Sequence, residues 1–147
     1  MPIISKMTES DLDQVAEIAS LSFARPWSRQ GFADALPMDN AYFLVARKDK
    51  MVVGYGGLSM ALDEGEIVSI AVKPDYKRQG IADKLIGQLL EAGRRSGVSR
   101  FFLEVRVTNA AAIRLYEKHG FGICGIRKNY YTEIHEDAYV MHCIDEE

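Results

Sequence analysis

Glu104 and Tyr116 are the two side chains whose type and setting could support acid–base chemistry. Glu104 lies within the apolar, strand-like run 102–105, where a carboxylate is costly unless it is exposed, paired or functional. Tyr116 has helical spacing from Ala112 and Ile113, so its pattern also fits an aromatic residue of the core. A carboxylate can remove a proton from an incoming amine, and a phenol can return one to a leaving group. The sequence therefore offers a candidate base and a candidate acid, with a solvated strand face and core packing as the alternatives.

Residues 77–80 form a basic, glycine-containing loop that could bind phosphate. The loop follows a β-branched and apolar run at 67–72 and precedes a helical pattern that repeats every four residues from Ile81. Because the first turn of a helix has unpaired N–H groups and a partial positive charge, this position suits a phosphate-bearing ligand. Gly80 would let the backbone approach the ligand closely. The alternative is a solvated connection, since strand-to-helix loops commonly contain these residue types.

Two segments resemble the GCN5-related N-acetyltransferases, the GNAT superfamily. The run Lys77-Arg78-Gln79-Gly80-Ile81-Ala82 resembles the Q/R-x-x-G-x-G/A pyrophosphate loop of that superfamily, although the superfamily usually has Gln or Arg at the position of Lys77. Asn109 and the segment 115–121 resemble its downstream acetyl-CoA segment. The resemblance implies acetyl-CoA as the co-substrate. It also implies the α/β GNAT fold, a mixed sheet of about seven strands and about four helices, with a parallel strand pair that separates at the acetyl-CoA site.

The GNAT resemblance further implies which residues contact acetyl-CoA. The pantetheine arm would pair with the backbone of the central strand, and that backbone could donate to the thioester oxygen, where charge develops during acyl transfer. The implied contacts are Ile70, Ala71, Val72, Lys77, Arg78, Gln79, Gly80, Ile81, Ala82, Asp83, Asn109 and Tyr116.

Other segments resemble a narrower family, the RimI-type alanine N-acetyltransferases, which acetylate the N-terminal alanine of protein eighteen of the small ribosomal subunit. The matching segments include Pro26-Trp27-Ser28, Leu103-Glu104-Val105-Arg106, Arg127-Lys128-Asn129-Tyr130-Tyr131 and Glu136-Asp137-Ala138. This resemblance implies direct transfer to a ribosomal protein N-terminus, with Glu104 as general base and Tyr116 as general acid. The implied acceptor contacts are Trp27, Tyr130 and Tyr131. The implied peptide groove runs between the break at 25–28 and the final hairpin.

The acceptor is the open question at this level. Acetylation of a small amine or of a lysine would use the same acetyl-CoA machinery, and a non-enzymatic acetyl-CoA-binding module is a third hypothesis. The presence of both Glu104 and Tyr116 disfavours the third. Trp27, the one tryptophan, also has an alternative reading as a packing residue between two helices.

Composition sets further bounds. The 147 residues carry a formal net charge of −3, so no electrostatic argument favours nucleic acid or an anionic membrane as a partner. The length predicts a single domain over residues 1–147, and we expect a monomer or a weak dimer.

No apolar run approaches the roughly 18 residues of a membrane span, and the N-terminus lacks the features of a signal peptide, so we expect a cytoplasmic location. The histidines lack ligand spacing, which predicts no metal site. Cys124 and Cys143 lie in apolar runs, which predicts buried, reduced thiols.

The apolar periodicity predicts a sheet flanked by helices. Expected strands cover residues 2–7, 41–47, 51–62, 67–72, 100–106, 122–131 and 138–144, and the later expected helices cover 80–96 and 109–119. Thr8 and Ser28 are expected to cap two earlier helices. The buried face expected for the first of these is Leu12, Val15, Ala16, Ala19 and Phe23. A crossover helix joins the strands at 67–72 and 100–106, so these two strands should be parallel.

Overall fold

The computed structural model describes residues 2–23 and 25–145, which form one seven-stranded mixed sheet with four α-helices. The strands are β1 (Ile3–Lys6), β2 (Ala41–Lys48), β3 (Met51–Ala61), β4 (Glu64–Val72), β5 (Arg100–Arg106), β6 (Gly122–Tyr131) and β7 (Glu136–Ile144). The helices are α1 (Leu12–Ser22), α2 (Arg29–Ala35), α3 (Ile81–Arg95) and α4 (Ala110–Lys118). The strand order is β1-β2-β3-β4-β5-β7-β6. These observations confirm the predicted fold class.

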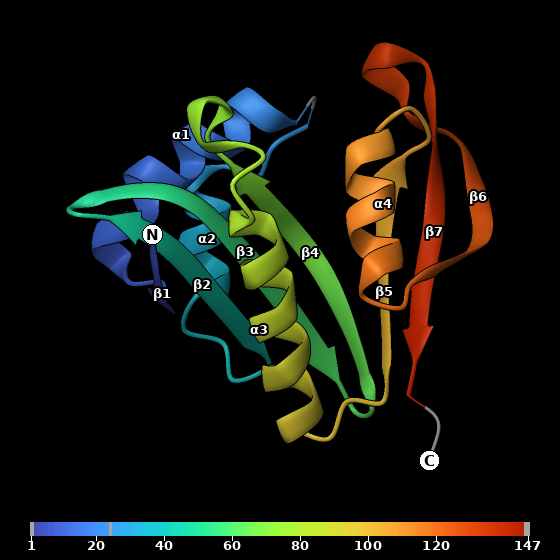
Figure 1. Cartoon of the computed structure of the whole chain (residues 1–147), viewed down its shortest axis with the longest axis horizontal. Helices are drawn as coiled ribbons and strands as arrows, with labels where there is room; N and C mark the ends of the chain where they lie inside the picture. The colour runs from blue at the N-terminus through green and yellow to red at the C-terminus, as the bar shows by residue number, and fades with distance from the viewer. Residues whose placement is uncertain (1, 24, 146–147) are drawn as a thin grey trace.

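The helices cover both faces of the sheet. α3 and α4 lie on the face toward the viewer in Figure 1, whereas α1 and α2 lie behind it. One buried cluster therefore packs under α3 and includes Leu85, Leu89 and Phe101, and the other packs under α1 and α2 and includes Leu12 and Phe32. Ser28 caps α2 by accepting a hydrogen bond from the Gly31 N–H, as predicted.

The two central strands pair only briefly. β4 and β5 are parallel, and their register joins residues 64–66 to residues 100–102 and no others. Beyond Glu66 the strands diverge, as Figure 1 shows between α3 and α4. The register of β3 and β4 also shifts at Val68, which marks a bulge in β4. Past the paired segment, one edge of β4 therefore faces the gap between the strands.

Two expectations about burial are wrong. α1 ends at Ser22, and Phe23 has an extended backbone with φ −128°. Phe23 is therefore 37% exposed and lies outside the buried face of α1, which includes Ile18 instead. Cys124 is exposed because it is the extra residue where the register of the edge strand β6 shifts between Ile123 and Gly125. Cys143 is buried, and both cysteines are free thiols.

Candidate active site

A cleft of about 420 Å³ opens at the gap between β4 and β5 and reaches the start of α3 and one side of α4. All of the residues predicted to contact acetyl-CoA line it except Gln79, which is exposed on the loop. Leu115, from the segment that resembles the acetyl-CoA segment, also lines it, and sequence analysis missed other lining residues, among them Ser22, Phe23, Tyr76 and Arg106. They come from separate segments that only the folded chain brings together.

The loop before α3 has the geometry of an anion site. Arg78 and Gly80 both have left-handed backbone conformations, with φ of 64° and 79°, and glycine adopts such a conformation without strain. The space beside Gly80 is open, because a Cβ added there would meet no atom within 4 Å. The N–H groups of the first turn of α3 have no partners within the helix. Together with Lys77 and Arg78, this end of the cleft fits the diphosphate of acetyl-CoA.

Asp83 joins the two helices that flank the cleft. Its Oδ1 lies 3.1 Å from Lys118 Nζ and 2.8 Å from His119 Nε2, both at the C-terminal end of α4. Hydrogen bonds from Lys118 and then from His119 lower the pKa of Asp83. His119 therefore does more than end α4: it also connects that helix to the first turn of α3 through Asp83.

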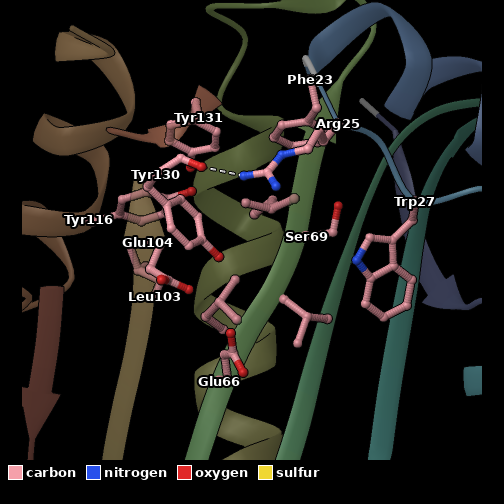
Figure 2. A pocket seen from close by; sticks show the side chains of 13 residues that line it. Phe23, Arg25, Trp27, Glu66, Ser69, Leu103, Glu104, Tyr116, Tyr130 and Tyr131 are labelled. Carbon is pink, nitrogen blue, oxygen red and sulfur yellow. Dashed lines mark hydrogen bonds between the residues drawn. The ribbon is translucent and has the colours of Figure 1, made fainter. Parts of the chain in front are cut away.

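A second cavity, of about 500 Å³, lies on the other side of the same gap (Figure 2). Glu104 projects into it from β5, with its side chain 16% exposed, and its Oε2 lies 2.5 Å from Nε of Arg127 on β6. Tyr130 lines the same cavity, and burial, the charge of Glu104 and a hydrogen bond to Glu104 raise its pKa. Glu104 is therefore a paired carboxylate that faces a cavity, which explains how an apolar strand tolerates it.

Tyr116 lies where the two cavities meet. It lines both of them, as do Ile70 and Phe23. Its ring is 7% exposed and packs against Phe121 with ring centroids 6.0 Å apart. Burial raises the pKa of Tyr116 above its ordinary value, so the phenol stays protonated. Within the described chain its hydroxyl makes no hydrogen bond and is not sealed from open space, so it is available to a ligand.

Residues from opposite ends of the chain form the mouth of the second cavity. Trp27 packs against Phe32 of α2 and Phe43 of β2, with ring centroids 5.2 and 6.0 Å apart, so it packs between a helix and the sheet and not between two helices. It also lines the cavity. Arg25 donates a hydrogen bond to the Tyr130 carbonyl, drawn as the dashed line in Figure 2. Tyr130 and Tyr131 stack edge to face with centroids 5.1 Å apart. The two walls predicted for the peptide groove are therefore in contact.

Sequence analysis missed Glu66 and Ser69, which line this cavity from β4. Ser69 is buried and shares a hydrogen bond of 2.7 Å with Tyr55, whose pKa burial raises to about 12. Burial also raises the pKa of Glu66, and the charge of Glu104 adds to this effect. The expected strand at 67–72 begins after Glu66, whereas β4 starts at Glu64, so Glu66 belongs to the strand and not to the turn before it.

Comparisons with known proteins agree with this geometry. Residues 12–121 match the Acetyltransferase (GNAT) family. The chain is 38% identical to the ribosomal protein bS18-alanine N-acetyltransferase of Escherichia coli over 96% of both chains. The crystal structure of the ribosomal-protein-S18-alanine N-acetyltransferase from Escherichia coli covers 100% of this chain and 96% of its own, with a TM-score of 0.89 at 35% identity. The chain is 34% identical to the N-alpha-acetyltransferase RimI of Mycobacterium tuberculosis, over 94% of this chain and 89% of that one.

The chain therefore belongs to the GNAT acetyltransferases, which use acetyl-CoA as the acetyl donor. Within that family it is an N-acetyltransferase of the RimI type. No helix of the described residues has the length and apolar character to cross a membrane. In the same residues, no group of three or more histidine, cysteine or acidic side chains is arranged to hold a metal ion.

Proposed function

We propose that this protein acetylates the N-terminal alanine of ribosomal protein bS18 by direct transfer from acetyl-CoA. The observation that supports direct transfer is that the two cavities share Ile70 and Tyr116. An amine in one cavity can therefore reach a thioester in the other without an enzyme-bound intermediate. Neither Cys124 nor Cys143 lines either cavity, so neither thiol is placed to carry the acetyl group. The names of the similar proteins support bS18 as the acceptor.

Each end of the site has a defined task in this proposal. The loop 77–80 and the first turn of α3 bind the diphosphate, and the open edge of β4 holds the pantetheine arm. When bound, acetyl-CoA supplies an activated acetyl group and a thiol leaving group. Glu104 takes a proton from the acceptor nitrogen, and Arg127 holds that carboxylate in place. Tyr116 donates its phenolic proton toward the sulfur.

The aromatic side chains at the mouth of the second cavity hold the acceptor. Trp27, Tyr130 and Tyr131 border the cavity that contains Glu104, and a peptide that enters between them would present its N-terminus to that carboxylate. A ribosomal substrate would place the enzyme in the cytoplasm. The single domain over residues 1–147 and the monomer or weak dimer stay predictions, and the continuous sheet from β1 to β6 supports the first of them.

Mass spectrometry of bS18 incubated with enzyme and acetyl-CoA tests the function. We expect one acetyl group on the N-terminal alanine, and none when that amine is blocked beforehand. Glu104→Gln should slow the reaction by about 10²- to 10⁴-fold, the contribution of a positioned base. Glu64→Gln removes the same charge from β4 outside both cavities, where the side chain is 47% exposed and pairs with Arg100. It is the matched control and should react normally. Acetylation of lysines alone, with an unmodified N-terminus, would contradict the proposal.

A further inference from the structure

Two carboxylates line the cavity in which we place the acceptor, and only one has a role so far. Glu66 and Glu104 project into this cavity from the neighbouring strands β4 and β5 (Figure 2). Glu66 is the last residue of β4 that pairs with β5, opposite Phe102. Since side chains two residues apart share a strand face, Glu104 lies on the same face as Phe102 and hence as Glu66. The parallel pairing therefore brings the two carboxylates together beside the point where the strands separate.

The two carboxylates differ in their partners. Glu104 has a salt bridge of 2.5 Å to Arg127 and a hydrogen bond with Tyr130. The backbone of Glu66 pairs with β3 and β5, but its carboxylate makes no hydrogen bond or salt bridge in the part of the chain that the structure describes, although the residue is only partly exposed to solvent. A half-buried carboxylate without a partner is costly unless it meets a ligand. Burial and the charge of Glu104 both raise the pKa of Glu66, so Glu66 accepts a proton more readily than an ordinary glutamate does.

Acetylation removes two protons from the acceptor nitrogen, so two basic groups can take part. Near neutral pH an α-amino group, with a pKa near 7.7–8.0, is mostly an ammonium ion. Its nitrogen must lose one proton to become a nucleophile and a second proton to become an amide. One carboxylate cannot hold both protons at once.

We propose that Glu66 is a second base of this active site, which accepts the proton that converts the acceptor ammonium into the free amine. The inference rests on the proposed function, since it requires an acceptor with an α-amino group. Glu66 becomes a carboxylic acid in this step, and the nitrogen gains its lone pair. The nitrogen–carbon bond then forms as the carbon–sulfur bond breaks. Glu104 takes the second proton from the nitrogen, while Tyr116 protonates the sulfur.

The protons balance over the cycle. Glu66 releases its proton to solvent through the cavity mouth, and the proton on Glu104 restores the phenol of Tyr116. The net result is one amide, one thiol and one proton in solution. The charged and titratable groups that face Glu66 across the cavity are Arg25, Glu104, Tyr116, Arg127, Tyr130 and Tyr131.

The test compares Glu66→Gln, Glu104→Gln and the control Glu64→Gln at two pH values. The probe is the N-terminal peptide of bS18 with its lysines blocked, and the readout is kcat/KM. At pH 6.5 more than about nine-tenths of the α-amine is protonated, so Glu66→Gln should be slower than wild type by about 100-fold. At pH 9.5 the amine arrives neutral, and the ratio should fall to about threefold or less. Glu104→Gln should keep its defect at both pH values, because the second proton must still leave.

A second acceptor gives an answer that does not depend on alkaline conditions. A peptide with an aminooxy group in place of the α-amine arrives unprotonated at neutral pH. Glu66→Gln should therefore transfer acetyl to it at about the wild-type rate. A Glu66→Gln ratio that is the same at both pH values, or wild-type activity at pH 6.5, would overturn the inference while leaving the proposed function intact. Failure of the wild-type enzyme to acetylate the bS18 peptide would overturn the proposed function and this inference with it.

Discussion

Replacing Tyr116 by phenylalanine separates its chemical role from its packing role. The substitution keeps the buried ring and its contact with Phe121, whose centroid lies 6.0 Å away, and deletes only the hydroxyl. That hydroxyl makes no hydrogen bond within the described residues, so its removal should change the free energy of unfolding by less than about 1 kcal/mol. A donor aimed at a developing charge contributes about 2.7–4 kcal/mol to the transition state, or roughly 10²- to 10³-fold in kcat.

The assay is thiol release at saturating acetyl-CoA and saturating bS18 peptide, beside urea unfolding of the same preparation. Because burial raises the pKa of Tyr116, the phenol keeps its proton across pH 6–10, and the size of the defect should not vary over that range. Tyr55→Phe is the complementary control, because it should affect stability and not turnover. It removes a buried hydrogen bond of 2.7 Å to Ser69, so it should cost about 1 kcal/mol of stability with little change in kcat. Normal turnover by Tyr116→Phe would return Tyr116 to the role of a core aromatic.

Three further predictions concern the cleft and the core. Arg78→Ala should weaken acetyl-CoA binding by about tenfold or more, because a charge-assisted contact contributes about 1.5–3 kcal/mol; calorimetry that finds unchanged affinity would remove Arg78 from the diphosphate site. Burial acts to raise the pKa of Asp11, but hydrogen bonds from Arg47 and from the Thr8 N–H outweigh it and lower the pKa. The stabilisation is therefore present above about pH 4, the unfolded pKa, and is lost as the pH falls through the folded pKa. Asp11→Asn should cost about 3–5 kcal/mol of unfolding free energy at pH 7, and urea titrations should show this cost shrinking as the pH falls below about 4; a cost that does not change with pH would contradict the assigned pairing. A Cβ at position 57 would overlap the ring of Phe43, so Gly57→Ala should lower stability by about 1–3 kcal/mol, and an unchanged thermal midpoint would show that the ring can move.

The order and type of the elements could be predicted because each depends on local pattern. The strand at 100–106 has the predicted bounds, and α3 differs from its predicted range by one residue at each end. Apolar spacing and turn residues act within a few positions along the chain, so one segment contains all of the information needed. Phe23 shows the limit of this reasoning. The periodicity of the preceding helix continues through it, but the chain leaves the helix at that residue, and the ring faces the cavities instead of the core.

Contacts between distant strands could not be predicted in the same way. The pairing of Glu104 with Arg127 depends on β7 lying between β5 and β6. The register places Glu104 opposite Val140, and Val140 opposite Gly125, two residues before Arg127. The long guanidinium side chain then reaches across β7. A hairpin pattern at 122–144 predicts two paired strands but not which of them adds to the sheet, so the partner of the proposed base was invisible in the sequence.

The same distinction explains why the acetyl-CoA site was easier to predict than the acceptor site. The proposed diphosphate loop lies in one continuous strand-loop-helix segment, and it would bind largely through backbone groups whose positions follow from a local conformation. The acceptor cavity is assembled from the break after α1, from β4 and β5, from α4 and from β6. At its mouth Arg25 contacts Tyr130, which lies 105 residues further along the chain. Substitutions in the break or in β6 can therefore reshape the acceptor cavity without touching the loop 77–80. We therefore expect acceptor choice to depend on tertiary contacts. Glu66 and Glu104 come from the two strands that border both cavities, so substitutions in the break after α1 should reshape the mouth of the acceptor cavity and leave these carboxylates in place.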